Sequence, residues 1–475
     1  MSDKTYVLLD DDGTLLDPGL QSLVLAKYSR SGLGARETLR EIRASLKATP
    51  EDQVDAFYSK WVDGYGHSSI QELASFPLCF DHCSMVAAKE LERLQRPGAC
   101  EHSSRYMRLG LGTFVPPTDD PTMAERCRRV VAPLYKAYGD LAPEVFTHAA
   151  KQLGYDVSYT NTPQTLLERV VMAKAFDSLR YLLPAGQGTG VALEMNGRDA
   201  KVLLRQMLVH PLPELRKLGE EGLEAVRQVW PFLVREIAPD DFTLRHRVKN
   251  FHGLGMADLF ENVQDSATGT TATPVQVLTL VGGHPRTWQV ENFVGRAAEF
   301  YGISPEEFRA WMNDRGPRVV PDVFRLVHLR ALFYTDYGAY RDLQRHRPPT
   351  KFVGTLVPLG EKALPPDLDD APQLQALFRQ AYDAFEKAYA AECMLPNLSN
   401  LELQYLCPLA TNVRYLFDMD LAEAYYMIEL RTTPQGHLSY RRAMYDLYRL
   451  LKEIAPEAMQ WCRAIDPNEV AGFHK

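Results

Sequence analysis

The chain has 475 residues, a formal net charge of −8 at pH 7 and 45% hydrophobic residues. A chain of this length suits two or three domains and can bury a large apolar core. The acidic balance argues against binding to a nucleic acid polymer, which requires a basic face. No apolar run approaches the roughly 18 residues of a membrane span, so we expect no membrane segment.

The termini and cysteines indicate the cellular compartment. The N-terminus, Met-Ser-Asp-Lys-Thr, lacks the charged and apolar regions of a signal peptide. The seven cysteines, an odd number spread over the chain, indicate reduced thiols rather than a disulfide framework. Cys79 and Cys83 are close in sequence, but no second cysteine pair completes a zinc set. We therefore predict a cytoplasmic protein without a metal site.

In the first half, apolar residues predict a strand at 6–9 and a strand or buried segment at 71–80. Helical spacing predicts helices at 17–28, 35–47, 83–96, 124–153, 164–181, 198–209 and 213–229. Residues 97–117, rich in Pro, Gly and Ser, predict a loop, and residues 236–273 contain the connector to the second half.

The second half repeats this plan. It predicts a strand at 275–280 and helices at 288–301, 305–313, 335–347, 372–392, 421–431 and 438–454. Helices dominate, with a few strands in each half, so we predict the α+β class with a small central sheet in each half.

An acidic turn near the N-terminus suggests a different function. Residues 10–14 read Asp-Asp-Asp-Gly-Thr, and Asp10-x-Asp12-Gly-Thr resembles the start of haloacid-dehalogenase-type phosphatases. In those enzymes the first Asp is the nucleophile and the second a general acid beside Mg²⁺. Asp119 and Asp120, a candidate later acidic pair, lie in a Pro-rich loop rather than after a strand. We interpret the motif as an acidic turn and keep a phosphatase as an alternative.

An internal repeat is visible in the residues themselves. Leu-Arg-Tyr-Leu-Leu-Pro at 179–184 matches Leu-Gln-Tyr-Leu-Cys-Pro at 403–408. Twelve residues after each proline come Asn196 and Asp420, and each copy then predicts an amphipathic helix that ends before a proline. We predict a tandem duplication of full domains, with a first copy at 1–240, a connector at 241–270 and a second copy at 271–475.

Two polar segments, one in each copy, complement each other. The second copy contains Arg345-His346-Arg347, and the first contains Ser103-Ser104-Arg105 after Glu101. When the two copies are aligned, these segments resemble the two ends of one motif, the signature of flavin-dependent thymidylate synthases. That signature is Arg-His-Arg, seven residues, then Ser-x-Arg. Four further segments resemble that family: Gly66–Phe76, Arg180-x-x-Leu-Pro, Asn196-x-Arg198, and Glu429-Leu430-Arg431 with Pro434–His437.

The resemblance implies roles that suit these side chains. A phosphate requires an Arg fork, hydroxyls and backbone N–H groups, and a guanidinium stabilises a uracil anion without losing its own proton. The implied nucleotide-binding residues are Glu101, Ser103, Ser104, Arg105, Arg180 and Arg431, with Arg180 and Arg431 also catalytic. The implied FAD-binding residues are His67, Ser69, Glu72, Asn196, Arg198, Arg345, His346 and Arg347.

Each copy lacks what the other has. Aligned with Arg345–Arg347 are Arg93-Leu94-Gln95, or Leu94-Gln95-Arg96 in the register shifted by one, and Met207 aligns with Arg431. Conversely, the second copy has Thr355, Val357, Gln404, Asp420 and Ala422 at the positions of Ser103, Arg105, Arg180, Asn196 and Arg198. We expect one composite site from both copies. The alternative is that both copies are degenerate.

The resemblance implies flavin-dependent C5 methylation, or a related C5 one-carbon modification, of a uracil nucleotide. FAD is the implied cofactor, and NADPH and methylenetetrahydrofolate are the implied co-substrates. Modification of UMP or another pyrimidine nucleotide, and a catalytically dead nucleotide- or flavin-binding scaffold, remain alternatives. We expect a pseudo-dimer of the two copies, and a homodimer of chains that imitates the family's tetramer. The family builds its sites across subunits, which favours a site between chains over one within a chain.

Overall fold

The structure is a computed structural model that describes residues 6–44, 50–64, 67–235, 237, 275–282 and 292–468. The chain divides into two units whose segments alternate in sequence. The first unit contains Met1–Cys83, Glu90–His102 and Thr189–His252, and the second contains Ser84–Lys89, Ser103–Gly188 and Gly253–Lys475. The second unit therefore combines segments of both predicted copies. The copy boundaries at 1–240 and 271–475 stay a prediction, and the predicted connector 241–270 lies outside the described residues.

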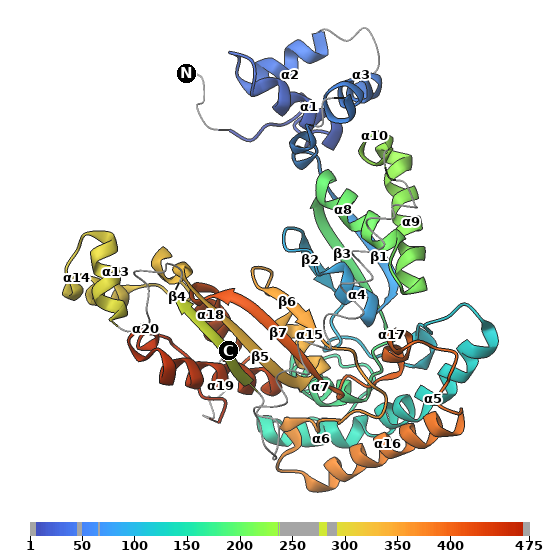
Figure 1. Ribbon diagram of the computed structural model, residues 1–475. Coiled ribbons are helices and arrows are strands. Elements are labelled where there is room, and N and C mark those ends of the chain that lie inside the picture. The colour runs from blue at the N-terminus through green and yellow to red at the C-terminus, as the bar shows by residue number, and fades with distance from the viewer. Residues whose placement is uncertain are drawn as a thin grey trace. The chain divides into compact units, whose positions relative to one another are not determined.

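The first unit is built on a three-stranded sheet with the order β1-β3-β2 (Figure 1). Phe76, Leu78 and Phe80 alternate along β1 and are buried, as expected for a strand with one face against the core. Helix α9 packs closely on α8, because a Cβ at Gly219 would lie only 2.7 Å from the Cβ of Met207. The strands are β1 (Ser75–Ser84), β2 (Gly98–Glu101) and β3 (Gly188–Asn196). The helices are α1 (Pro18–Tyr28), α2 (Ala35–Ala44), α3 (Pro50–Tyr58), η1 (Ser59–Gly64), η2 (Ser68–Leu73), α8 (Gly197–Leu208), α9 (Pro213–Val229) and α10 (Pro231–Val234); α4 (Met85–Leu91) runs from the second unit into the first.

The second unit contains an antiparallel sheet with the order β4-β5-β7-β6. Figure 1 shows α18 and α19 along this sheet, and α5, α6 and α16 in a helical layer. The strands are β4 (Val275–Gly282), β5 (Val327–Asp336), β6 (Thr350–Val353) and β7 (Asn412–Asp420). The longer helices are α5 (Pro121–Asp140), α6 (Ala142–Leu153), α7 (Leu166–Leu179), α13 (Phe293–Tyr301), α14 (Pro305–Asp314), α15 (Tyr337–Leu343), α16 (Pro372–Ala391), α18 (Leu421–Arg431) and α19 (Leu438–Ile454). The short ones are η3 (Leu111–Thr113), η4 (Arg180–Leu182), η6 (Asp322–Leu326), η7 (Pro366–Leu368), α17 (Asn400–Leu403), η8 (Gln404–Leu406) and α20 (Pro456–Met459). The α+β prediction is confirmed.

The two copies have the same order of elements with matching lengths. Strands β1 and β5 have 10 residues each, β3 and β7 have 9 each, and α9 and α19 have 17 each. Asn196 and Asp420 cap equivalent helices: their Oδ1 atoms accept from Asp199 N at 2.9 Å and from Glu423 N at 2.7 Å. These correspondences confirm the tandem duplication.

Equal element lengths also decide the register of the Arg-His-Arg segment. Helices α4 and α15 have 7 residues each, and β2 and β6 have 4 each. The segments between α4 and β2 and between α15 and β6 therefore correspond residue by residue. Arg345-His346-Arg347 aligns with Arg93-Leu94-Gln95, and the register shifted by one is wrong.

Within the second unit, equivalent parts of the two copies pack against each other. The 20-residue helices α5 and α16 are in contact. Ala185 N donates to Cys407 O at 2.8 Å, and Leu409 N donates to Leu183 O at 2.8 Å. Because Leu183 and Ala185 correspond to Cys407 and Leu409, these two bonds are reciprocal, as in a two-fold symmetric dimer interface. The reciprocal bonds support the pseudo-dimer.

Several predicted elements differ in the structure. The predicted loop 97–117 contains the strand β2, and the predicted helix 335–347 is only α15. Residues 6–9 form no strand, and a strand without a paired neighbour leaves its backbone groups unsatisfied. The predicted helix 83–96 is only α4, because β1 continues to Ser84 and the residue before Pro97 disfavours helix. The predicted helix 124–153 is two helices, α5 and α6, which meet at Leu141 just before Pro143.

The acidic turn near the N-terminus is occupied by local contacts. Asp10 and Asp11 pair with Arg43, and Asp12 Oδ1 accepts from Thr14 N at 2.9 Å. The described residues before the turn, 6–9, form no strand, and no described group of three His, Cys, Asp or Glu residues has the arrangement of a metal site. The strand-end geometry that phosphatase chemistry requires is therefore missing, which removes the support for that alternative.

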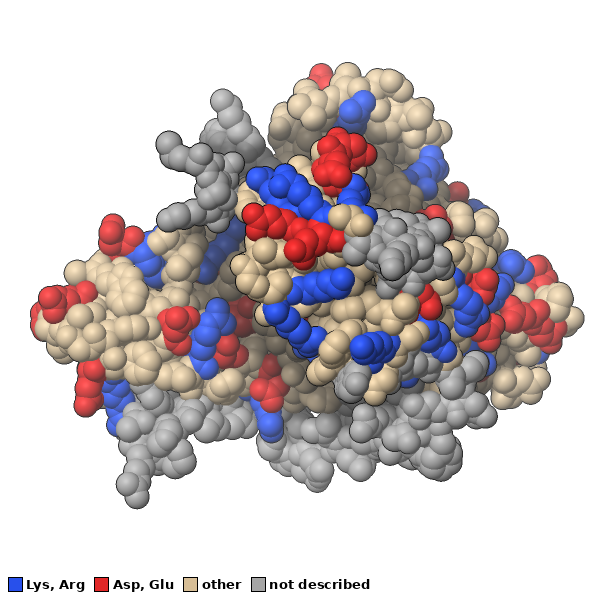
Figure 2. All heavy atoms as spheres, turned by 90° about the horizontal axis from the view of Figure 1, so that it is seen from above, with Lys and Arg blue, Asp and Glu red and all other residues tan. Residues whose placement is uncertain are grey.

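The structure also shows the state of the cysteines and the distribution of charge on one face. All seven cysteines are free thiols. None of the helices that the structure describes is long and apolar enough to cross a membrane. On the face shown in Figure 2, basic and acidic side chains are interspersed rather than separated by sign.

Candidate functional site

The predicted phosphate loop lies in the second unit. Ser103 Oγ accepts a hydrogen bond from Arg105 N at 3.3 Å, and Ser104 is buried. Arg105 Nη2 donates to Asp177 Oδ2 at 2.7 Å, while its buried Nε has no hydrogen-bond partner among the described residues. Burial opposes the charge of Arg105, but Asp177 and, to a smaller extent, Tyr440 raise its pKa. The loop therefore keeps a charged arginine with a donor to spare.

Asp177, near the end of α7, is the buried counter-ion of this loop. Burial raises the pKa of Asp177 to about 6, although Arg105 and Arg180 act in the opposite direction. The backbone carbonyl of Asp177 accepts from His437 Nε2 at 3.1 Å, and His437 Nδ1 accepts from Ser439 N at 3.3 Å. Burial holds the pKa of His437 well below its usual value, so this histidine is neutral with its proton on Nε2.

Arg180 joins the two copies through an ion pair. Its Nη1 donates to Asp342 Oδ2 at 2.9 Å, and its side chain is only 3% exposed. Its Nε and Nη2 have no hydrogen-bond partner in the part of the chain that the structure describes. Gly338 lies beside it, where a Cβ would be in ordinary contact, 3.6 Å from both of these nitrogens.

The charges of this pair stabilise each other. Burial works against both ions, but Asp342 and Asp177 raise the pKa of Arg180, while Arg180 and Arg345 hold the pKa of Asp342 far below its usual value. We refer to Arg105, Asp177, Arg180 and Asp342 as the arginine–aspartate cluster. Three of its buried nitrogens have no hydrogen-bond acceptor among the described residues, an arrangement that suits an anionic or carbonyl-bearing ligand.

A second cluster, the His346 triad, consists of Glu423, His346 and Arg431. Arg431 Nε donates to His346 Nε2 at 2.7 Å, and His346 Nδ1 lies 3.2 Å from Glu423 Oε1. His346 therefore accepts through Nε2 and donates through Nδ1. Burial, with Arg431 second, lowers the pKa of His346 to about 3, so the ring is neutral.

Glu423 and Tyr440 complete the surroundings of this triad. Burial, with a contribution from Asp420, raises the pKa of Glu423 to about 7. The Arg431 guanidinium lies over the Tyr440 ring, 5.5 Å from its centroid. Tyr440 also contributes to raising the pKa of Arg105. Arg345 and Arg347, in the segment that follows α15, are exposed.

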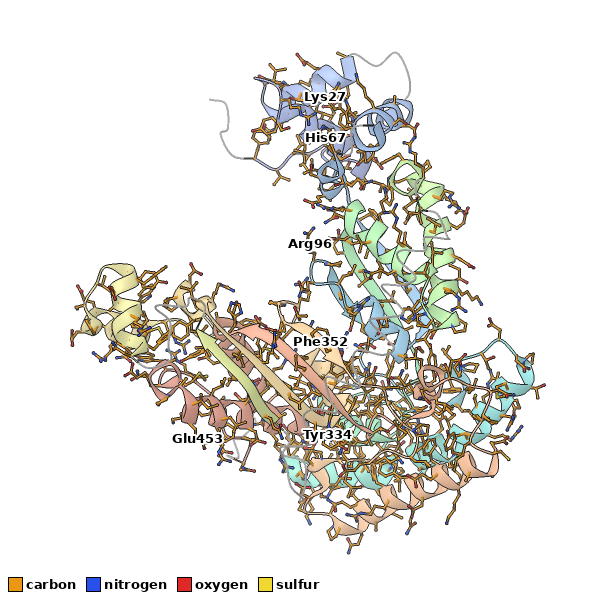
Figure 3. All side chains as sticks on the ribbon, in the orientation of Figure 1. Lys27, His67, Arg96, Tyr334, Phe352 and Glu453 are labelled. Carbon is orange, nitrogen blue, oxygen red and sulfur yellow. The ribbon has the colours of Figure 1, made fainter. Side chains whose placement is uncertain are left out.

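The other predicted flavin residues lie in the first unit. His67, labelled in Figure 3, precedes η2, Ser69 lies within it, and both are exposed. The centroids of the His67 and Trp61 rings are 6.0 Å apart. Glu72 pairs with Arg198, which lowers the pKa of Glu72, and Asn196 Nδ2 donates to Asp199 Oδ2 at 2.8 Å. Glu101 is buried on β2 opposite Val191 of β3.

Several residues of these clusters were not predicted from the sequence. Arg96, labelled in Figure 3, pairs with Glu72 at 3.2 Å and lies 3.7 Å from Asp199. Asp177, Asp342 and Glu423 contact predicted site residues but are absent from the motifs, because a carboxylate gives no signal of its own among 61 Asp and Glu residues. His437, which contacts Asp177, lies in the matched Pro434–His437 segment but was not predicted as a site residue.

Comparison with known proteins relates the chain to a family. The model of the family described as "Thymidylate synthase complementing protein" matches residues 23–232 and 317–457. A UPF0159 protein of Chlamydia muridarum is 26% identical over 95% of this chain and 90% of its own length. A UPF0159 protein of Thermoplasma acidophilum is 23% identical over 94% of this chain and 95% of its own length.

One relative has a named activity. A flavin-dependent thymidylate synthase of Saccharolobus solfataricus is 22% identical over 249 residues, which cover 86% of that protein but 51% of this chain. Most of the relative thus corresponds to about half of this chain. This ratio, and the two segments of the family match, agree with two copies of the family's domain.

Proposed function

Because the chain belongs to the family of thymidylate synthase complementing proteins, we propose that it is a flavin-dependent enzyme that adds a one-carbon unit to C5 of a uracil nucleotide. One observation carries the proposal. The second unit contains Arg105 and Arg180 of the first copy together with His346 and Arg431 of the second.

In this proposal, the first copy binds the nucleotide. Ser103, Ser104 and Arg105 hold its phosphate, and the spare Nε of Arg105 donates to a phosphate oxygen. Arg180 contacts the pyrimidine carbonyls through Nε and Nη2. Asp342 and Asp177 keep these guanidinium groups charged and oriented, so their binding geometry exists before the nucleotide arrives.

The second copy supplies the electrostatics for ionising the ring. Arg431 stabilises the uracil anion at N3, because a guanidinium remains protonated while negative charge develops on the base. Neutral His346 orients Arg431 through its Nε2, and Glu423 holds the histidine in the tautomer that accepts this bond. The second copy has Val357 in place of Arg105, so we propose one nucleotide per chain.

The donor set of the first unit fits the anionic part of a flavin nucleotide. Arg198 and Arg96 are 44% and 63% exposed, and His67 is exposed. In the first unit His67, Ser69, Glu72, Asn196 and Arg198 would hold FAD; in the second, Arg345, His346 and Arg347 have the same assignment by resemblance. FAD supplies redox chemistry that protein side chains lack, with NADPH as the proposed reductant and methylenetetrahydrofolate as the proposed carbon donor.

We further propose that the nucleotide site forms within one chain. The family resemblance favours a site between chains, but the Arg180–Asp342 pair already joins the two copies inside one unit. A homodimer of chains remains part of the proposal. Light scattering after size-exclusion chromatography tests it: a monodisperse monomer at micromolar concentration contradicts the dimer.

The decisive experiment starts from the purified full-length chain. We expect flavin absorbance, either as isolated or after reconstitution with FAD, followed by C5 modification of dUMP or UMP when NADPH and methylenetetrahydrofolate are present. Parallel assays with the two nucleotides identify the substrate. Flavin and nucleotide binding without turnover of either would favour the dead scaffold, and a protein that binds neither would contradict the proposal.

A further inference from the structure

Arg431 is the last residue of α18, at the end of a helix where backbone carbonyls have no partner within the helix. Its Nε donates to His346 Nε2 at 2.7 Å, so a small displacement of this helix end would break the bond. The structure holds the chain on both sides of Arg431, at Glu429 and at Thr432, which are both buried. The contacts at these two positions come largely from residues 315–318, which precede η6, and from residues 461–465, which follow α20.

The buried Glu429 carboxylate accepts hydrogen bonds from three residues outside its own helix. Its Oε1 accepts from Arg463 N at 3.0 Å, and its Oε2 accepts from Arg318 N at 2.6 Å. The guanidinium of Arg315 adds a donor to each oxygen, with Nη1 at 3.3 Å from Oε2 and Nη2 on Oε1. Burial opposes the charge of Glu429, but these bonds, those of Arg315 first, hold its pKa below the usual value. Each carboxylate oxygen therefore has two donors.

Arg315 also links the two segments that surround Glu429. Its side chain is only 2% exposed. Its Nη2 donates to the backbone carbonyl of Trp461 at 2.5 Å, and its Nη1 donates to that of Gly316 at 3.1 Å. In return, Arg463 Nη2 donates to the backbone carbonyl of Arg315 at 2.9 Å. The loop after α14 and the segment after α20 are therefore tied to each other as well as to α18.

Thr432 provides the second point of contact, directly after Arg431. Its Oγ1 accepts from Ile465 N at 3.1 Å and donates to the carbonyl of Ile428, one turn back in α18, at 2.7 Å. Its own carbonyl accepts from Arg441 Nε of α19 at 3.2 Å. Residues 461–465 thus hold the end of α18 before Arg431, through Glu429, and after it, through this threonine.

The loop that supplies one of these donors contains a residue with unfavourable backbone geometry. Arg318 has a φ angle of 63°, in the left-handed region that disfavours a residue with a Cβ. Its N–H nevertheless points at Glu429 Oε2. Such a conformation persists only where the surrounding contacts fix it, and such residues cluster at functional sites. The shape of this loop is therefore adapted to the carboxylate of Glu429.

The carboxylate occurs only in the copy that has the arginine. When the caps of α8 and α18 are aligned, Arg205 and Met207 of the first copy stand at the positions of Glu429 and Arg431. The first copy thus has a cation where the second has a buried carboxylate. Glu429 accompanies Arg431 and is not a general feature of this helix in the fold.

We propose that Glu429, held by Arg315 and by residues 461–465, positions Arg431 for the reaction. The contacts on both sides of the arginine fix the end of α18, and the direction of its guanidinium toward His346 follows from that. Glu429 acts through Arg431 in this role, so it is a positioning residue rather than a catalytic one. The placement of Arg431 follows from these contacts alone; only the effect on turnover rests on the proposed function.

The test compares two variants that release the end of α18. Glu429→Gln has nearly the same shape, but an amide nitrogen does not accept hydrogen bonds, so it faces two donors whichever way the amide is turned. Thr432→Val removes the hydroxyl that accepts from the segment after α20, and it decides the test if Glu429→Gln does not fold. Glu392→Gln is the matched control, because it also neutralises a carboxylate, one that pairs with two arginines of α5. Circular dichroism and thermal unfolding check that each variant is folded.

Nuclear magnetic resonance of the full-length chain with isotopically labelled arginine reports on Arg431 without any turnover. The Nε–H signal of Arg431 is identified by its absence from Arg431→Ala. We expect this signal to shift, or to broaden beyond detection, in Glu429→Gln and Thr432→Val, and to keep its wild-type position in Glu392→Gln. A wild-type signal in the deciding variant, or no Nε–H signal from Arg431 in the wild type, overturns the proposal.

Turnover separates positioning from a purely structural role. Glu429→Gln should lower kcat by about tenfold or more with KM within about twofold of the wild type. In an Arg431→Ala chain it should cause no further loss, because it acts through the missing arginine. A further loss of about tenfold in that chain would show a separate route and overturn the proposal. A wild type without turnover contradicts the proposed function, while the Arg431 signal still decides the positioning role.

Discussion

Arg431 Nε donates a hydrogen bond of 2.7 Å to His346 Nε2, although the two residues are 85 positions apart in sequence. This bond makes the histidine an acceptor and fixes the direction of the guanidinium, so the two residues of the family motifs act together. Glu423 Oε1 lies 3.2 Å from the other ring nitrogen, Nδ1. The triad therefore depends on hydrogen-bond geometry as well as on charge, so that a lysine, for example, does not reproduce the contact of Arg431.

The first prediction concerns Arg431. Arg431→Ala should lower turnover by about 10²-fold or more, because it removes an electrostatic donor that acts mainly in the transition state, while nucleotide and flavin affinities change little. Steady-state kinetics and equilibrium titration separate the two effects. Arg449→Ala on α19, an exposed position, is the matched control. Full turnover in Arg431→Ala would rule out the composite site.

The second prediction concerns the phosphate loop. Arg105→Ala should weaken nucleotide binding by about 2–4 kcal/mol, since a charge-assisted group is lost and Asp177 remains buried without it. Val357→Ala, at the equivalent position of the second copy, should have little effect because Val357 is 55% exposed and faces no proposed phosphate. Calorimetric titration measures both affinities. Equal losses in the two variants would show that the copies are not specialised.

The third prediction concerns the buried ion pair between the copies. Asp342→Asn should lower the free energy of unfolding by about 3–5 kcal/mol, because it removes the carboxylate that pairs with the buried Arg180 guanidinium. Asp140→Asn removes one member of the exposed Lys136–Asp140 pair and should cost at most about 1 kcal/mol. Urea unfolding of both variants gives the comparison. A cost for Asp342→Asn as small as that of the control would mean that the buried pair contributes no more to stability than an exposed pair.

The fourth prediction concerns pH. The pKa of Glu423 rises from 4.5 to about 7 on folding, so the folded protein holds an additional proton between these values and its free energy of unfolding falls as the pH increases through this window. His346, whose pKa falls from 6.5 to about 3, has the opposite effect below pH 6.5. The contribution of Glu423 is therefore clearest above that pH.

Glu423→Gln isolates this contribution. The amide retains an acceptor for His346 Nδ1 and has no charge to bury, so the variant should gain stability relative to the wild type between about pH 6 and about pH 8. Urea unfolding at both pH values measures the difference. A constant difference between the two proteins would mean that Glu423 does not titrate in this range.

The fifth prediction distinguishes a site within one chain from a site between chains. Chains with Arg431→Ala and chains with Arg105→Ala should remain inactive when mixed under conditions that exchange subunits, because no chain then holds both arginines. Recovery of activity in the mixture, compared with each variant alone, would place the site between chains. Mass spectrometry of differentially labelled chains verifies the exchange.

Local features predicted much of the fold. The helices α9, α18 and α19 begin and end where amphipathic spacing placed them, at 213–229, 421–431 and 438–454. Their ends are set by nearby residues such as the Asp420 cap, which the sequence displays directly. The strand predicted at 6–9 failed because a strand depends on a distant partner, and apolar residues alone do not provide one.

By itself, the sequence determined the duplication, the family and the complementary loss of Arg105 and Arg431 equivalents, because each of these is a pattern of residue types in order. Only the tertiary structure decided the register of Arg345–Arg347, the interleaving of the two units and the partners Asp342, Asp177 and Glu423. Which carboxylate pairs with a buried cation depends on distance and burial in the folded chain, not on spacing along the sequence. The sequence alone therefore does not distinguish Asp342, Asp177 and Glu423 from the other carboxylates.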